Sequence, residues 1–364
     1  MENERKENKI SIRQLMIIYV MSIAPSVIRT VPTITASIAK QASWVTTFAL
    51  LIFFVPLLYV LFKMISIGKE TSLEDAYEKA IGKIPTKILL AFYIIWIFIV
   101  SCVNLRYFAE RFTASILIET PIEFFYLTLL IIVFIVARKN IEYFARFNEI
   151  FIIFFIVFFA LMLVIPISSI KIENLFPVTT MDIVPIFKSV YGELGIGVYI
   201  TFILFIGNKI SDKENMNKHI LYQVISVVIV NTVLILSTVG IFGAKATAQL
   251  SLPFFTFLKS VNEFSIIERI ESIFISLWVA TDFTALATFV FIITKLIKKT
   301  FNLTYRKELV TPIVFGIYIF SQYLAGNINE LTSFSHDIAL YVNIFLGFVI
   351  PIVIYVIGKI RKVF

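Results

Sequence analysis

One apolar stretch of the sequence, Asp182 to Gly207, contains residue types that could form a binding site inside a membrane. Its middle reads Tyr191-Gly192-Glu193-Leu194-Gly195-Ile196-Gly197. Each glycine disfavours helix by roughly 1 kcal/mol relative to alanine, and a carboxylate at membrane depth costs roughly 2.5–3.5 kcal/mol or more. Unpaired backbone groups are tolerated there only where protein or a water-filled cavity covers them. The pattern predicts two half-helices that meet at an unwound joint at 192–197. A glycine-flexed helix, tightly packed on a neighbour, is the alternative.

A second apolar stretch, Ile12 to Ile38, contains a comparable irregularity, Ser22-Ile23-Ala24-Pro25-Ser26. Pro25 lacks an amide hydrogen and disfavours helix at the residue before it. We therefore expect a second joint at 22–26, with a kinked but continuous helix as the alternative. N-terminal ends of half-helices attract a carboxylate, and their C-terminal ends offer carbonyls to an amine or a cation. A zwitterionic amino acid would fit both ends without a charged side chain.

Three ionisable residues inside apolar stretches are candidates for binding a ligand, a proton or a cation. Glu193 could meet an amine of the ligand. Arg29 could pair with a carboxylate, or it could extend toward the outer membrane interface instead. Asp282 could be a proton or cation partner, or it could form a salt bridge with a basic residue of another span.

Small polar side chains could line the wall of the same cavity. Ser101 and Asn104 lie one helical turn apart, and Thr281, Thr284 and Thr288 have the i, i+3, i+7 spacing of one helix face. Packing between helices is the alternative use of such residues. The sequence has no Walker loop, dinucleotide-binding glycine pattern, nucleophile elbow or His/Cys metal spacing. We therefore expect no enzyme activity, no metal site and no cofactor.

The composition is that of a membrane protein. Hydrophobic residues make up 59% of the 364 residues and charged residues only 15%, and about 20 apolar residues are enough to span a bilayer. We expect one transmembrane domain over residues 1–364, embedded in a lipid bilayer. Its apolar segments are roughly 11–38, 45–64, 86–110, 122–138, 147–167, 183–207, 219–242, 270–294, 309–326 and 338–358.

The net charge of +8 could indicate nucleic-acid binding, but the positions of the basic residues give another explanation. Most lysines and arginines lie in the two terminal tails and in alternate connections between the apolar segments. By the positive-inside rule, this distribution places both termini in the cytoplasm and requires an even number of spans. We therefore expect no nucleic-acid partner.

Ten spans can divide into two halves of five, about 11–167 and 183–358. An odd number of spans in each half inverts the second half in the membrane, and interrupted helices then occupy matching places in the two halves. The two predicted joints lie in such places, in the first span of each half. The predicted fold is an all-α membrane protein with a 5+5 inverted repeat and discontinuous first and sixth helices.

Two connections are longer than a turn requires. Residues 65–87 predict an amphipathic helix that begins after Ser72, has Glu74 and Asp75 in its first turn and ends before Gly82. Residues 243–271, on the outer side, predict a re-entrant or interfacial segment that could cover a site.

Two parts of the sequence resemble a known family. One is Ile10-Ser11-Ile12-Arg13-Gln14-Leu15, followed at the end of the first span by Ala39-Lys40-Gln41-Ala42-Ser43-Trp44. The other is Leu252-Pro253 with Ile267-Glu268-Arg269-Ile270-Glu271-Ser272-Ile273-Phe274-Ile275-Ser276-Leu277-Trp278. These parts resemble the B subunit of GerA-type spore germinant receptors, the endospore germination permeases.

The resemblance implies a LeuT-like fold of the amino acid/polyamine/organocation superfamily and a location in the spore inner membrane. It also implies a complex with an A subunit and a lipoprotein C subunit. The nutrient germinant, often an amino acid, would bind between the first, third, sixth and eighth spans. On this chain, the joints would be 22–26 and 192–197, and the cavity wall would include Ser101, Asn104, Trp278 and Thr281.

The chain departs from the family pattern at both joints. Members commonly have glycine at the first joint, where this chain has Ala24 and Pro25. A Gly-x-Glu is common near the second joint, where Gly197-Val198-Tyr199 stands, with Glu193 upstream. The leading hypothesis is a germinant-sensing receptor subunit that signals to partner subunits. The alternatives are a proton- or cation-coupled amino acid transporter and a scaffold subunit that binds no ligand.

Overall fold

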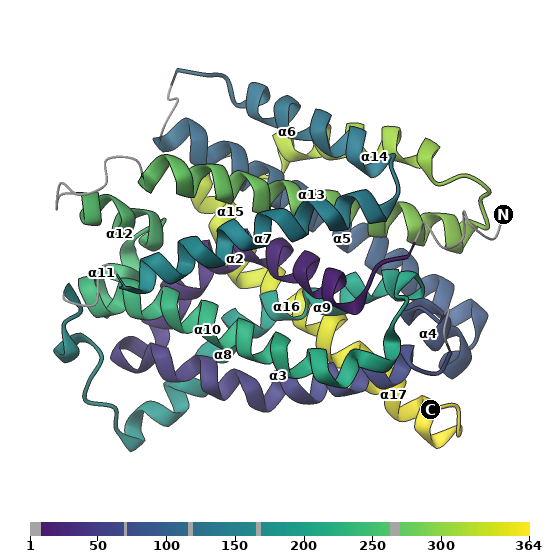
Figure 1. Ribbon diagram of the computed structural model, residues 1–364, viewed down its shortest axis with the longest axis horizontal. Helices are drawn as coiled ribbons and strands as arrows, with labels where there is room; N and C mark the ends of the chain where they lie inside the picture. Colours follow the sequence, from purple (N-terminus) through teal and green to yellow (C-terminus); the bar gives the residue numbers. More distant parts are fainter. Residues whose placement is uncertain (1–8, 69–70, 116–118, 165–168, 263–269) are drawn as a thin grey trace.

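The structure is a computed structural model that describes residues 9–68, 71–115, 119–164, 169–262 and 270–364. It is a bundle of long helices that run mostly along one axis (Figure 1). Over these residues, β-structure is limited to a single bridge between Ile10 and Ile210. The predicted all-α class is therefore confirmed.

Helix occupies each of the ten predicted membrane segments in the described part of the chain. The helices are α2 (Ile12–Ala39), α3 (Ser43–Ile65), α5 (Lys83–Ser115), α6 (Ile122–Ala137), α7 (Ile141–Val164), α8 (Ile183–Gly197) with α9 (Tyr199–Ile203), α10 (Met216–Phe242), α13 (Ile270–Phe301), α14 (Val310–Tyr323) and the run of α15 (Ile328–Phe334), α16 (Leu340–Ile344) and α17 (Ile350–Ile360).

Length and composition alone identify seven stretches of the described residues as able to cross a membrane. The first of them, Ile12–Ile65, contains two predicted segments, because the 3-10 turn Lys40–Ala42 joins α2 directly to α3. Two further predicted segments form the shorter helices α6, of 16 residues, and α14, of 14 residues.

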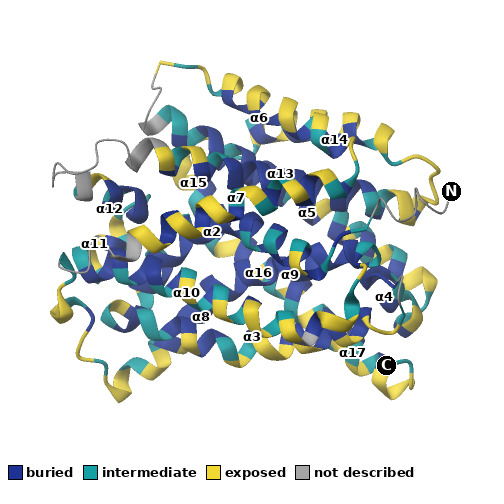
Figure 2. Ribbon diagram, in the orientation of Figure 1, coloured by how far each residue is buried: buried dark blue, intermediate teal, exposed yellow. Residues whose placement is uncertain are grey.

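The distribution of apolar side chains is that expected of a protein surrounded by lipid. The stretch from α8 to Lys209 and the helix α13 lie in the middle of the bundle, and their central residues are almost all buried. Outer helices expose large apolar side chains instead, such as Ile131, Ile132 and Ile135 of α6 (Figure 2). Outward apolar surface of this extent is typical of contact with acyl chains rather than water.

The first predicted joint is wrong in its local structure. Residues 22–26 lie inside the continuous helix α2, with Pro25 and Pro32 both within it. Membrane helices tolerate an internal proline where neighbouring helices pack around the freed backbone groups, and residues 22–26 are all buried. The continuous helix, given above as the alternative, is therefore correct for α2.

The second predicted joint is displaced along the chain. Residues 192–197 are helical, and the helix is interrupted at Val198. There the Thr201 amide donates to the Val198 carbonyl at 2.9 Å, three residues back, so the Gly197 carbonyl is free to accept from the Tyr19 hydroxyl at 2.8 Å. A 3-10 helix, Leu204–Lys209, completes the sixth span. The irregular backbone of this span thus begins after the glycines.

The glycines of α8 allow close packing of helices. A Cβ atom on Gly192 would lie 2.7 Å from Ile34 Cγ2 of α2. A Cβ atom on Gly195 would lie 2.7 Å from Leu340 Cδ2 and 3.1 Å from the Leu340 Cα of α16. Small residues at such contacts let membrane helices approach each other closely. Gly192 and Gly195 therefore set the distance of α8 from α2 and from α16.

Replacement of Gly195 by alanine is expected to destabilise the protein by about 1–3 kcal/mol, because an added methyl group overpacks the contact with α16. Gly197→Ala is the matched control, since its Cβ would lie 3.5 Å from Phe54, an ordinary contact distance. Melting temperatures of both variants in one detergent test this prediction. Equal melting temperatures for the two variants would contradict it.

The predicted helix in the connection 65–87 is confirmed as α4 (Leu73–Ile81). Ser72 and Asp75 form a capping box at its start, and Gly82 ends it with φ of 92°. Lys299 at the end of α13 donates to Asp75 at 2.8 Å. Burial alone would raise the pKa of the Asp75 carboxyl, but the hydrogen bonds from Lys299 and Ser72 outweigh it and lower that pKa.

The start and the end of the described chain lie at the same end of the bundle. The Ile10 amide donates to the Lys209 carbonyl at 2.9 Å, and Arg361 donates to the Ala80 carbonyl of α4 at 2.9 Å. This end is called the basic end below, because it carries the lysines and arginines that the charge pattern assigns to the cytoplasm.

The predicted outer segment 243–271 contains two short helices, α11 (Ala244–Gln249) and α12 (Pro253–Asn262). Phe254 of α12 stacks on Phe159 of α7 with ring centroids 5.7 Å apart. The rest of this segment, residues 263–269, lies outside the described residues, as does the Ile267-Glu268-Arg269 part of the family-like motif.

Candidate functional site

Four polar side chains from four different spans meet in the interior of the bundle. The Tyr199 hydroxyl lies close to the side chains of Ser26, Asn104 and Asn343. Ser26 also donates to Asn104 at 3.4 Å, and all four residues are buried. We call Ser26, Asn104, Tyr199 and Asn343 the polar cluster.

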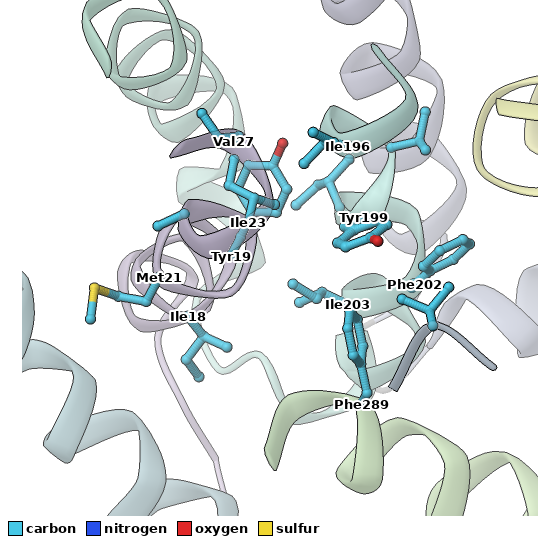
Figure 3. Packing of buried hydrophobic residues seen from close by; sticks show 14 of the residues in the cluster. Ile18, Tyr19, Met21, Ile23, Val27, Ile196, Tyr199, Phe202, Ile203 and Phe289 are labelled. Carbon is cyan, nitrogen blue, oxygen red and sulfur yellow. The ribbon is translucent and has the colours of Figure 1, made fainter. Parts of the chain in front are cut away.

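The backbone irregularities of the sixth and tenth spans position two members of the polar cluster. Tyr199 follows the helix interruption at Val198, and its ring lies edge-on to Phe289 of α13 at 5.3 Å between centroids (Figure 3). Asn343 lies in α16, between the π-helical turns 335–339 and 345–349. Such π-turns are frequent at functional sites. Trp96 of α5 fixes Asn343 by donating to its Oδ1 at 2.7 Å.

Arg29 lies one helical turn beyond Ser26 on α2. Its guanidinium carbon lies 3.6 Å from the centroid of the Tyr107 ring, a cation–π contact with α5. The Tyr107 hydroxyl donates to Ser335 at 3.1 Å, which connects this contact to the tenth span. Arg29 takes part in none of the ion pairs found among the described residues. It is therefore placed to attract a carboxylate close to the polar cluster.

Asp282 of α13 forms a buried ion pair with Arg111 of α5. Their side chains are 3% and 8% exposed, with 2.9 Å between Asp282 Oδ2 and the Arg111 nitrogen. The Arg111 guanidinium also covers the ring of Trp278, 3.6 Å from its centroid. Asp282 thus has the interhelical salt bridge given above as the alternative to a free proton or cation partner. The Trp278 indole nitrogen is buried and has no hydrogen-bond partner among the residues that the structure describes.

The threonine face of α13 bonds to neighbouring helices. Thr288 and Ser22 of α2 share a hydrogen bond at 3.1 Å, and Thr284 donates to Asn148 of α7 at 2.7 Å. Thr281 donates to the Trp278 carbonyl of its own helix at 2.7 Å. Thr288 and Thr284 therefore connect the eighth span to the first and fifth spans, whereas Thr281 does not.

Glu193 faces different helices from the polar cluster. Thr47 of α3 donates to its Oε1 at 3.2 Å, and Asn231 of α10 donates to its Oε2 at 2.7 Å. The carboxyl group is buried, and both its oxygens already accept a hydrogen bond from the protein. The structure therefore places Glu193 between the second and seventh spans.

A cleft of about 960 Å³ opens at the basic end, not at the polar cluster. Lys295, Lys298 and Arg306 are among its lining residues, with Glu74 of α4. Lys295 already pairs with Glu74 at 2.7 Å. The positive-inside distribution accounts for this concentration of basic side chains, so the cleft needs no ligand to explain it.

Comparison with known proteins identifies the family. The family model described as spore germination protein matches residues 9–330. The chain belongs to the spore germination protein family. Spore germination protein KB of Bacillus subtilis (strain 168) is 20% identical to it over 362 residues, which cover 97% of this chain and 95% of the relative. The resemblance noted in the sequence is thus confirmed, and the family is of a permease kind rather than an enzyme kind.

A solved structure gives the fold of this spore germination protein. The crystal structure of MhsT in complex with L-phenylalanine matches it with a TM-score of 0.67 at 10% identity, over 98% of this chain and 99% of MhsT. The LeuT-like fold is therefore confirmed. With its apolar helices, the germination protein is an integral membrane protein. The repeat boundaries 11–167 and 183–358 stay a prediction.

The structure brings together some of the predicted site residues of this spore germination protein and separates others. Ser26, Asn104 and Tyr199 meet in the polar cluster, with Arg29 one turn away. Ser101 bonds to the Ile97 carbonyl of its own helix at 2.7 Å. The remaining predicted residues make other contacts. In α2, Ile23 and Ala24 line a small cavity with Asn231, and Pro25 is buried. In α8, Tyr191 stacks on Tyr341, Gly192 packs on Ile34, Gly195 packs on Leu340, and the Gly197 carbonyl accepts from Tyr19.

Sequence reasoning missed several residues that complete the site. Asn343 and Asn231 are amides in otherwise apolar stretches of their spans, and this polarity is a signal that could have identified them. Arg111 lies near the end of a span and reads as an interfacial cation until its partner Asp282 is known. Trp96 and Tyr107 have no sequence signal, because aromatic residues are common throughout this chain.

Proposed function

We propose that this protein is the ligand-binding membrane subunit of a spore germination receptor and that it senses a small nutrient, most simply an amino acid. The observation that carries the proposal is the polar cluster with Arg29 beside it. Four uncharged polar side chains and one cation, Arg29, which forms no ion pair among the described residues, converge from the first, third, sixth and tenth spans.

This arrangement has the chemistry needed to bind an amino acid. Arg29 would pair with the α-carboxylate, and the oxygens of Ser26, Asn104, Tyr199 and Asn343 would accept from the ammonium group. The Tyr107 ring, which contacts Arg29, offers aromatic surface near the same place. The crystal structure of MhsT, which shares the fold, contains L-phenylalanine, and this supports an amino acid as the class of ligand.

A sensor needs a conformation that the ligand favours and partners that respond to it. A ligand shifts the population of two states only by its difference in affinity for them. Two of the four spans that meet at the polar cluster contain an interrupted helix or π-turns, so binding there would bias their packing against the other two spans. By the family resemblance, the partners would be an A subunit and a lipoprotein C subunit in the spore inner membrane, with both termini of this chain toward the spore core.

Spores that carry Tyr199→Phe are expected to need about a tenfold higher germinant concentration, because the variant removes one buried hydroxyl that contacts the ligand site. Tyr355→Phe, near the C-terminus, is the control. The measurement is the germinant concentration for half-maximal germination, with receptor levels matched by immunoblot. An unchanged requirement in both variants would favour a scaffold that binds no ligand.

A proton- or cation-coupled transporter is the second candidate function. The observation that favours it is Glu193, a buried carboxyl group with two uncharged hydrogen-bonding partners, Thr47 and Asn231. Uptake of labelled amino acids into vesicles that contain this chain alone separates the two functions. Saturable, gradient-driven uptake would favour the transporter, and binding without uptake would favour the sensor.

A further inference from the structure

A groove on the outside of the bundle runs between α2, α7 and α10, with a volume of about 540 Å³. Its walls are almost entirely apolar. Phe155, Phe159 and Val233 are buried at its floor, whereas Ile156 and Ile229 form rims that are 59% and 51% exposed. The groove therefore opens sideways, toward the acyl chains of the bilayer.

The polar residues of the groove gather at one end. Arg13 lies in the first turn of α2, and His219 and Tyr222 lie in the first turns of α10. This end coincides with the basic end of the bundle, since Ile12 of α2 donates to Asp212 of the preceding connection at 2.7 Å. Arg13 is exposed and forms none of the ion pairs found in the described ranges. The cation is thus at the depth where lipid phosphates lie.

Gln223 is the independent sign of a ligand in this groove. It lines the groove with only 2% of its surface exposed, and its Nε2 has no hydrogen-bond partner in the described part of the chain. A buried donor without an acceptor destabilises a protein by about 1–3 kcal/mol, so such groups usually have a partner. The ester carbonyl of a glycerolipid, which lies below the phosphate, is an acceptor of the required kind.

The length of the groove matches one acyl chain. The distance from His219 to Val233 along α10 is about 21 Å at 1.5 Å per residue. The hydrocarbon half of a bilayer is about 15 Å thick, half of the usual core, and the remainder accommodates the ester and phosphate region. A chain anchored at Arg13 would therefore fill the groove down to its floor.

We propose that this groove is a binding site for an anionic phospholipid. Its phosphate would lie at Arg13 and His219, its ester carbonyl at Gln223 and one acyl chain along Phe155, Ile156 and Ile229. Charge complementarity favours an anionic headgroup, because Arg13 meets the phosphate and no acidic residue lines the groove as described.

The groove adjoins a very small cavity in the interior of the protein. This cavity shares Val20, Phe155, Ser226 and Val230 with the groove and ends at Asn231, which bonds to Glu193. The lipid would therefore stabilise the contact of α2 with α10, and only Asn231 would separate this contact from the buried Glu193 carboxyl group. This inference does not depend on the identity of the germinant.

Photo-crosslinking tests the site on the full chain in phosphatidylcholine vesicles that contain a trace of phosphatidylglycerol with a photoactivatable acyl chain. Peptide mapping should find adducts concentrated at 152–160 and 222–233. Ile156→Trp with Ile229→Trp should lower that yield at least fivefold by filling the rims. Leu221→Trp, on the exposed face of the same helix and outside the groove, should leave it unchanged.

Headgroup preference is tested by competition with unlabelled phosphatidylglycerol or phosphatidylcholine. Arg13→Gln should lower the preference for phosphatidylglycerol about fivefold, the factor expected for one basic residue near a membrane surface. The tryptophan pair and Arg13→Gln lie at separate places, so misfolding of one leaves the other informative. The proposal would be overturned if the crosslinking yield per residue in the groove were no higher than on the exposed face of α6. Such a result would indicate only contact with bulk lipid.

Discussion

Replacing Asp282 by alanine is expected to lower the free energy of unfolding by about 3–5 kcal/mol, because Arg111 is then buried without its counter-charge. The pair is 2.9 Å apart and nearly inaccessible to solvent. It also joins α5 to α13, and α13 lies in the middle of the bundle. Unfolding in mixed micelles of detergent and SDS measures the difference.

Two controls make the Asp282 prediction specific. The double variant Arg111→Met with Asp282→Leu should recover most of the loss, since an apolar pair of similar size often replaces a buried ion pair without penalty. Glu142→Ala removes the Glu142–Arg146 ion pair, in which Arg146 is 66% exposed, and should change stability by less than about 1 kcal/mol. An equal effect of Asp282→Ala and Glu142→Ala would show that the buried pair is not important for stability.

Arg29→Gln is expected to weaken binding of an amino acid germinant by about 10- to 100-fold. The variant keeps a polar side chain of comparable length but removes the charge that would meet the carboxylate, and hydrogen bonds to charged groups contribute about 1.5–3 kcal/mol. The readout is the germinant concentration for half-maximal germination of spores that differ only at this position.

Arg106→Gln is the matched control for Arg29. Arg106 also lies in a span, but it pairs with Glu110 of its own helix at 2.6 Å and with Tyr126 of α6 at 3.2 Å. The Arg106→Gln substitution should therefore change the germinant concentration for half-maximal germination very little. Amino acid esters, which lack the carboxylate, should bind the wild type weakly and discriminate little between wild type and Arg29→Gln. A normal requirement in Arg29→Gln spores would contradict the assigned role of Arg29.

The sequence predicted the helices well because their signal is local. Long apolar runs separated by charged connections define membrane segments without reference to their neighbours. The signal for helix α4 is equally local, because Ser72, Asp75 and Gly82 specify both of its ends within a stretch of eleven residues. The match of the motif around Trp278 to a known family then identified the fold, which apolar runs alone cannot.

The predicted joints failed in part because helix propensity is a weak determinant in a packed interior. Pro25 removes one backbone hydrogen bond, yet buried surroundings keep α2 helical. The glycines at 192–197 reduce helix propensity, but their main effect is to admit Ile34 and Leu340. Tertiary packing overrides propensity in this way whenever neighbouring helices fit closely.

The composition of the site could be predicted only in part because its members are distant in the sequence. Asn104 was identified from its position in a span and Tyr199 from the family resemblance, but their partner Asn343 lies more than a hundred residues beyond both. Glu193 was expected near the ligand, and only the fold shows that it faces Thr47 and Asn231. Polarity within a span indicates that a residue has a partner, but not which one.

The most direct measurement is equilibrium binding of labelled amino acids to the purified chain in lipid nanodiscs. The account predicts saturable binding of one amino acid per chain, weakened in Tyr199→Phe and in Arg29→Gln but not in Tyr355→Phe. Binding that is identical in all four proteins would contradict it, as would the absence of binding for every amino acid that germinates spores carrying this chain.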